Sequence, residues 1–149
     1  MKNWWKRVLG FDDGPSTPER HLEIRPTHEC FDDAIDFMVQ QLKIDPSLMH
    51  KRDLLLVHGI CLTPDGKPFA HAWVEQGNIV WNSGNLLEQK IYTAIDRKQF
   101  YSECRVTHST KYSPREMIAY NVTFNNFGPW VLEYRKLCLD NHNHHHHQS

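Results

Sequence analysis

The strongest constraint on the fold of this chain is an almost continuous apolar run at residues 54–62, LLLVHGICL. A run of this length with β-branched members is typical of a strand that is buried on both faces. Two further segments, 69–75 (FAHAWVE) and 78–82 (NIVWN), flank the dipeptide Gln76-Gly77 and predict a β-hairpin. We therefore expect a buried strand followed by an antiparallel hairpin.

Helix signals lie on both sides of these strands. Over residues 30–42 the apolar positions recur at three- and four-residue spacing, which predicts one amphipathic helix. Asp96 is a candidate N-cap of a short helix, and residues 106–112 are a candidate strand. Residues 113–116 (SPRE) form a capping box with proline at the first helical position, so a helix is expected from there to roughly Phe124. Strands and helices together predict an α+β fold.

The chain has 149 residues, about the size at which one hydrophobic core closes. We expect a single domain over residues 21–138. Residues 1–20 combine an amphipathic segment with a linker, and Trp4 and Trp5 are candidates for contact with a partner or a membrane surface. Residues 139–149 are rich in histidine and are expected to be a tag or a disordered tail, which we exclude from the site.

Charge and cysteine spacing exclude several classes of function. With 17 basic and 18 acidic residues the net charge is -1, which gives no general attraction for a nucleic acid. No apolar run reaches the roughly 18 residues of a membrane span, and we expect neither a transmembrane helix nor a signal peptide. The cysteines make no CxxC pair, so reduced thiols in the cytoplasm, without metal or cofactor, are expected; they are Cys30, Cys61, Cys104 and Cys138.

The predicted hairpin brings a histidine and an amide together. A two-residue loop at Gln76-Gly77 would place His71 directly opposite Asn82, where Cβ atoms are about 4.5–5.5 Å apart. An odd-length loop would make the contact diagonal. A neutral imidazole acts as a general base only if its tautomer and orientation are held, and the amide oxygen of Asn82 can do that. His71 is therefore a candidate base and Asn82 its orienting partner.

Cys30 is the candidate nucleophile because it lies in the first turn of the predicted helix. Free backbone N–H groups and the helix dipole at that end favour a thiolate. Asp32 and Asp33 act in the opposite sense, and the hypothesis requires their carboxylates to point into solvent. A cysteine at such a position is, taken alone, more often a small buried apolar residue.

These residues resemble the papain-like and transglutaminase-like cysteine hydrolases, in particular small phage and bacterial proteins that include lasso-peptide leader proteases. The resemblance spans roughly residues 28–130 and is carried by Cys30-Phe31 with Ala34, by Leu56-Val57-His58-Gly59-Ile60, by His71-Ala72-Trp73-Val74-Glu75, by Tyr112-Ser113 and by Gly128-Pro129-Trp130. It implies an antiparallel sheet packed against the helix that carries Cys30. Such relatives usually have Asp as the third residue, where this chain has Asn82.

The resemblance implies a cysteine hydrolase or acyltransferase acting on an amide or thioester bond of a peptide or protein substrate. His28, His58 and Trp73 are candidate residues of the substrate cleft, although His58 and Trp73 also suit a packed core. The alternative is a non-catalytic papain-fold protein of phage or bacterial origin that binds a protein partner. Thiol reactivity distinguishes the two, because only an active site requires one privileged cysteine.

Overall fold

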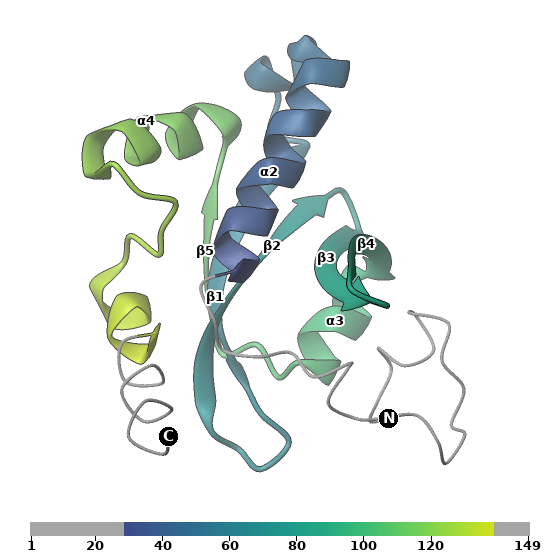
Figure 1. Ribbon diagram of the computed structural model, residues 1–149, viewed down its shortest axis with the longest axis vertical. Coiled ribbons are helices and arrows are strands. Elements are labelled where there is room, and N and C mark those ends of the chain that lie inside the picture. The colour runs from purple at the N-terminus through teal and green to yellow at the C-terminus, as the bar shows by residue number, and fades with distance from the viewer. Residues whose placement is uncertain (1–28, 139–149) are drawn as a thin grey trace.

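The predicted buried strand forms the centre of the fold. The computed structural model describes residues 29–138, in which β1 (Leu54–Leu62) pairs with β2 (Pro68–Gln76) on one side and with β5 (His108–Tyr112) on the other. β3 (Ile79–Leu86) and β4 (Gln89–Asp96) complete an antiparallel sheet of order β4-β3-β2-β1-β5 (Figure 1). The α+β prediction is confirmed at this level.

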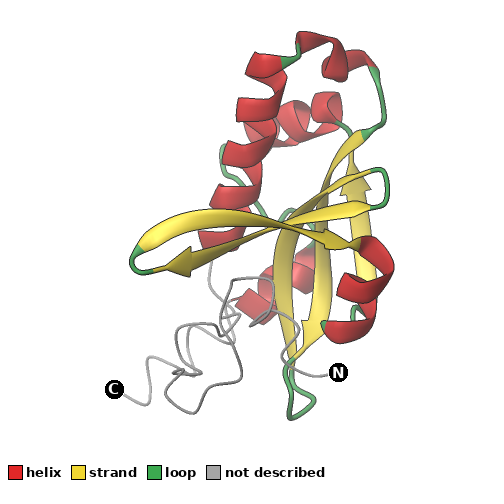
Figure 2. Cartoon of the chain, turned by 90° about the vertical axis from the view of Figure 1, so that its right-hand side faces the viewer, coloured by secondary structure: helices red, strands yellow, loops and turns green. Residues whose placement is uncertain are grey.

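Helices precede, interrupt and follow the strands. Their bounds are α2 Glu29–Ile44, the 3-10 turn η2 Pro46–His50, α3 Arg97–Glu103 and α4 Pro114–Phe124, and residues 132–138 are also helical. α2 lies across one face of the sheet and α3 on the other (Figures 1 and 2). None of the helices within residues 29–138 combines the length and the apolar character that a membrane span requires.

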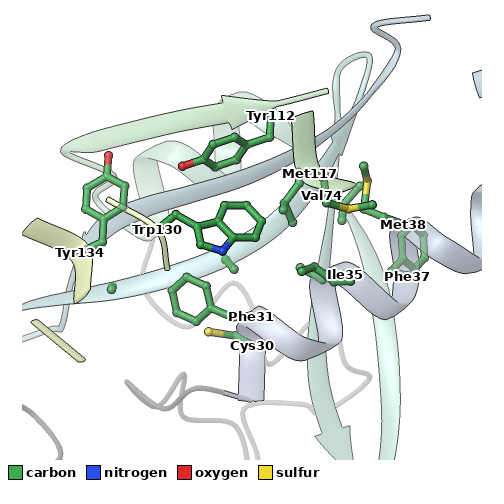
Figure 3. Packing of buried hydrophobic residues seen from close by; sticks show 14 of the residues in the cluster. Cys30, Phe31, Ile35, Phe37, Met38, Val74, Tyr112, Met117, Trp130 and Tyr134 are labelled. Carbon is green, nitrogen blue, oxygen red and sulfur yellow. The ribbon is translucent and has the colours of Figure 1, made fainter. Parts of the chain in front are cut away.

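The strands β1 and β2 are buried on both faces, which explains their lack of hydrophobic alternation. Even-numbered side chains of β2, such as Ala70, Ala72 and Val74, pack with α2. Odd-numbered side chains, such as Phe69 and Trp73, pack in a second cluster with residues of α3. The α2 face is the larger cluster, and each large side chain fully buried there contributes about 1.5–3 kcal/mol (Figure 3).

The predicted register of the hairpin is wrong by two residues. Gln76 pairs with Ile79, so the two-residue loop is Gly77-Asn78 rather than Gln76-Gly77. Gly77 has φ 59°, and glycine at the first central position is the preference of a type II′ turn. Because the slip is even, it keeps every side chain on its expected face; a slip of one residue would have reversed them.

β3 leaves β2 soon after the turn. Pairing between the two strands ends at Val74 and Trp81, whereas β3 pairs with β4 along its whole length, from Ile79 to Leu86. Figure 2 shows the β3–β4 ribbon running steeply across the other three strands. On the side that faces β3, the edge of β2 is therefore open from Val74 back toward Pro68. That open edge bounds the candidate site.

The local capping signals predicted two helices well. Asp96 caps α3, its side chain accepting the N–H of Gln99 at 3.1 Å. Ser113 and Glu116 form the reciprocal capping box at the start of α4. The predicted N-terminal helix is also present, as α2. The strand β4 was not predicted from the sequence.

Candidate functional site

His71 and Asn82 meet in the structure as the sequence suggested. Nε2 of His71 lies 3.0 Å from Oδ1 of Asn82, and both side chains are buried, with 2% and 7% exposure. Since an amide oxygen only accepts, the proton of the neutral imidazole is on Nε2. In the corrected register the contact is diagonal, and it lies just past the point where β2 and β3 stop pairing.

The remaining ring nitrogen of His71, Nδ1, is buried and has no hydrogen-bond partner among the described residues. With its proton on Nε2, the imidazole presents Nδ1 as a lone-pair acceptor. Burial lowers the pKa of His71 to about 4, against a smaller upward effect of the Asn82 hydrogen bond. The His71 imidazole is thus neutral and oriented, and its accepting nitrogen has no hydrogen-bond partner within residues 29–138.

Aromatic side chains hold the His71 ring on the α3 side of the sheet. Phe69, Trp73 and Phe100 have ring centroids 5.9, 5.8 and 6.4 Å from that of His71. Phe100 comes from α3, so the helix that Asp96 caps also packs on the imidazole. This packing restricts rotation of the ring beyond what one hydrogen bond would do.

Cys30 occupies the first turn of α2 and is 6% exposed. Its thiol approaches the backbone of Ala72, two residues beyond the last β2–β3 pair and next to His71 in the chain. Burial raises the pKa of Cys30 far above its ordinary value, and the hydrogen bond from Ala72 only partly opposes this. The thiolate that the helix start was expected to favour is therefore not the resting form.

The two acidic residues beside Cys30 behave differently. Asp32 is exposed, as the hypothesis requires. Asp33 is buried instead and forms an ion pair with Lys90 of β4, and its charge adds to the rise of the Cys30 pKa. Lys90 was missed because β4 was missed, although the β-branched and aromatic residues of 91–95 (IYTAI) were an available signal for a strand.

Cys30 and His71 reach β2 from its two faces. Cys30 belongs to the cluster that packs with α2, whereas the His71 ring lies among residues of the α3 cluster. Neither ring nitrogen of His71 is hydrogen-bonded to the thiol, since Nε2 bonds to Asn82 and Nδ1 has no partner within residues 29–138. The structure joins His71 to Asn82 and brings Cys30 to the adjacent backbone of Ala72; the Cys30–His71 pair stays a prediction.

The candidate cleft residues are placed as follows. His58 is completely buried, with ring centroids of Phe31, Tyr112 and Trp130 at 4.8, 5.2 and 5.0 Å. Trp73 is also buried, and its indole N–H donates to Glu75. His28, Trp4 and Trp5 lie outside the described residues.

Glu75 is a buried carboxylate that was not predicted as a site residue. Its Oε2 accepts hydrogen bonds from Trp73 Nε1 at 3.0 Å and from the hydroxyl of Tyr101. Lys111 and Arg97 lie 3.0 and 3.9 Å from Oε1. Glu75 therefore fixes the indole that flanks His71, and its charge is balanced by two cations.

Within residues 29–138, no group of three or more His, Cys, Asp or Glu side chains is gathered in a way that could hold a metal ion. Comparison with protein-family models, with curated proteins and with solved structures finds no match to this chain.

Proposed function

We propose that the chain is a cysteine-dependent hydrolase or acyltransferase of papain-like type, with Cys30 as nucleophile, His71 as base and Asn82 as orienting residue. The observation that carries the proposal is the buried His71–Asn82 hydrogen bond, 3.0 Å long, which leaves Nδ1 without a partner in the described structure. A histidine held in this way has one nitrogen oriented and the other available for a proton.

The proposed reaction begins when the sulfur of Cys30 attacks the carbonyl carbon of an amide or thioester. Because the two groups lie on opposite faces of β2, the proposal requires the thiol proton to reach Nδ1 of His71 around the open edge of that strand. His71 then gives the proton to the leaving amine or thiol. Water attacks the resulting thioester in a hydrolase, and an amine does so in a transferase. We propose a peptide or protein in the cytoplasm as the substrate.

Burial determines the protonation state from which this reaction would start. The raised pKa of Cys30 and the lowered pKa of His71, about 4, make the resting pair a neutral thiol and a neutral imidazole. Proton transfer then accompanies attack rather than preceding it. We expect the rate of acylation to rise with pH above neutrality and to show no plateau set by a thiolate–imidazolium pair.

Acyl transfer from p-nitrophenyl acetate tests the proposal on the full chain. Each cysteine lies in its own tryptic peptide. Cys30 is in 21–43, Cys61 in 53–90, Cys104 in 99–105 and Cys138 in 137–149. We expect acetylation of the 21–43 peptide at least tenfold faster than of the other three. Equal rates for all four peptides would contradict the proposal.

Two variants separate the base from the fold. His71→Gln keeps a polar side chain but removes the base, and should lower acetylation of Cys30 by more than tenfold. His108→Gln changes an exposed histidine and should leave it unchanged. Far-UV circular dichroism and the urea midpoint establish that both variants are folded, so that a loss in His71→Gln alone is assigned to the base.

The second candidate function is a binding protein that keeps this fold without catalysis. The observation that favours it is burial, because Cys30 and His71 are only 6% and 2% exposed and the pKa of the thiol is raised. This reading predicts no privileged cysteine in the acetylation experiment. It also predicts that His71→Gln changes stability without changing the rate at any thiol.

A further inference from the structure

Two further cysteines, Cys61 and Cys104, lie on the opposite face of the sheet from Cys30. Cys61 is near the end of β1, and Cys104 is the C-cap residue of α3. Both are buried thiols in the cluster that also contains Trp73 and Phe100. They are far apart in sequence, and a backbone contact between the end of α3 and the end of β1 brings them together.

A backbone hydrogen bond measures how close the two residues are. The N–H of Leu62 donates to the carbonyl oxygen of Cys104 over 3.1 Å. The Cα of Cys61 is two bonds from that nitrogen, and the Cα of Cys104 is two bonds from that oxygen. Standard bond lengths then limit the separation of the two Cα atoms to roughly 8 Å, and any bend in the path shortens it. Disulfides join Cα atoms about 4.4–6.8 Å apart.

The direction of the side chains agrees with this closeness. Cys61 is an odd-numbered residue of β1 and faces the α3 cluster, and Cys104 is buried in the same cluster. The charge of Cys104 raises the pKa of the Cys61 thiol, second only to burial among its causes. Two sulfurs thus share one apolar space, beside the aromatic rings that flank His71.

We propose that Cys61 and Cys104 are a redox pair that closes to a disulfide on exposure to a peroxide. One sulfur, as its thiolate, attacks hydrogen peroxide to give a sulfenic acid, and the hydroxide released takes up a proton to become water. The second thiol displaces the sulfenic hydroxyl as a second water and forms the S–S bond. The two thiols lose two electrons and two protons, and one peroxide is reduced to two waters.

The bridge would tie the end of α3 to β1. Phe100 of α3 packs on Trp73 and on the His71 ring, with centroids 5.0 and 6.4 Å away. Oxidation would therefore fasten the helix that covers the imidazole, without involving Cys30. The bridge depends on the fold alone and does not require the proposed hydrolase activity.

Peptide mapping of the full chain tests the pair directly. The chain is treated with hydrogen peroxide at pH 8, blocked with N-ethylmaleimide and digested with trypsin without reduction. We expect a cross-link between peptides 53–90 and 99–105 as the main product, removed by dithiothreitol and absent in Cys104→Ala. Because both thiols are buried, closure should take hours and should accelerate with pH as the thiolate fraction rises.

The same treatment in 8 M urea is the matched control. In an unfolded chain shorter loops close more readily, and Cys30 with Cys61, or Cys104 with Cys138, are closer in sequence than Cys61 with Cys104. Urea should therefore shift the cross-links toward those pairs. A folded chain that forms a Cys30–Cys138 bridge instead, or that keeps Cys61 and Cys104 as thiols, would overturn the inference.

Discussion

Acidification from pH 7.5 to pH 5 should destabilise the folded chain by about 2 kcal/mol through His58 alone. His58 is 0% exposed, and neither ring nitrogen has a hydrogen-bond partner in the described part of the chain. Burial lowers the pKa of His58 from 6.5 to about 3. An imidazolium there would lose its hydration and gain no hydrogen bond, so the folded state resists protonation.

The sign and size follow from proton linkage. Below pH 6.5 the unfolded chain binds a proton at His58, whereas the folded chain binds one only near pH 3. Stability is therefore complete above pH 6.5 and is lost as the pH falls toward 3. At pH 5 the loss is about 1.5 pH units at 1.36 kcal/mol each, or about 2 kcal/mol. His71, with a pKa lowered to about 4, adds a similar amount, so the total is about 4 kcal/mol.

Urea unfolding followed by tryptophan fluorescence at pH 7.5, 6.5, 5.5 and 5.0 measures this loss. His58→Leu replaces the ring by an apolar side chain of similar volume among the surrounding aromatic rings. It should reduce the loss between pH 7.5 and 5 from about 4 to about 2 kcal/mol. His108→Leu, at an exposed site, should leave the loss unchanged. If His58→Leu keeps the full wild-type pH dependence, the linkage argument is wrong.

Three further substitutions have expected outcomes. Asn82→Asp places a carboxylate against Nε2 of His71 and should raise its pKa by at least one unit, read as a shift of the imidazole resonances in a pH titration by NMR. Gly59→Ala puts a Cβ 2.5 Å from the backbone oxygen of His108 and 2.8 Å from the Trp73 ring, and should cost about 1–3 kcal/mol in urea unfolding; an unchanged midpoint would contradict the close packing. Ser113→Ala removes the N-cap of α4 and should cost about 1 kcal/mol, seen as a lower thermal midpoint, and Ser113→Gly should lose less.

Elements with local signals were predictable because their causes lie within a few residues. The capping box at Ser113 and the cap at Asp96 each satisfy backbone N–H groups of their own helix. The apolar run of β1 required burial on both faces whatever its neighbours were. β4 was missed because its alternation is weak, with only Ile95 fully buried, and it is stabilised mainly by pairing with β3.

The His71–Asn82 contact shows both the reach of sequence reasoning and its limit. The sheet face on which each side chain lies was predictable, because side chains alternate along a strand and a register shift of two residues preserves that alternation. Its register was not, because the choice between loops at Gln76-Gly77 and Gly77-Asn78 depends on turn geometry and on how far β3 follows β2. The contact forms despite the changed register because the two side chains reach each other where β2 and β3 are no longer paired.

By itself, the sequence determined the segments that form α2, α3, α4, β1, β2, β3 and β5, and that His71 and Asn82 share a face. These properties depend on spacing along the chain. Only the tertiary structure decided the burial of Cys30, the aromatic enclosure of His58 and the meeting of Cys61 with Cys104. Desolvation and contact depend on atoms that distant segments bring to one place, so no local pattern contains them.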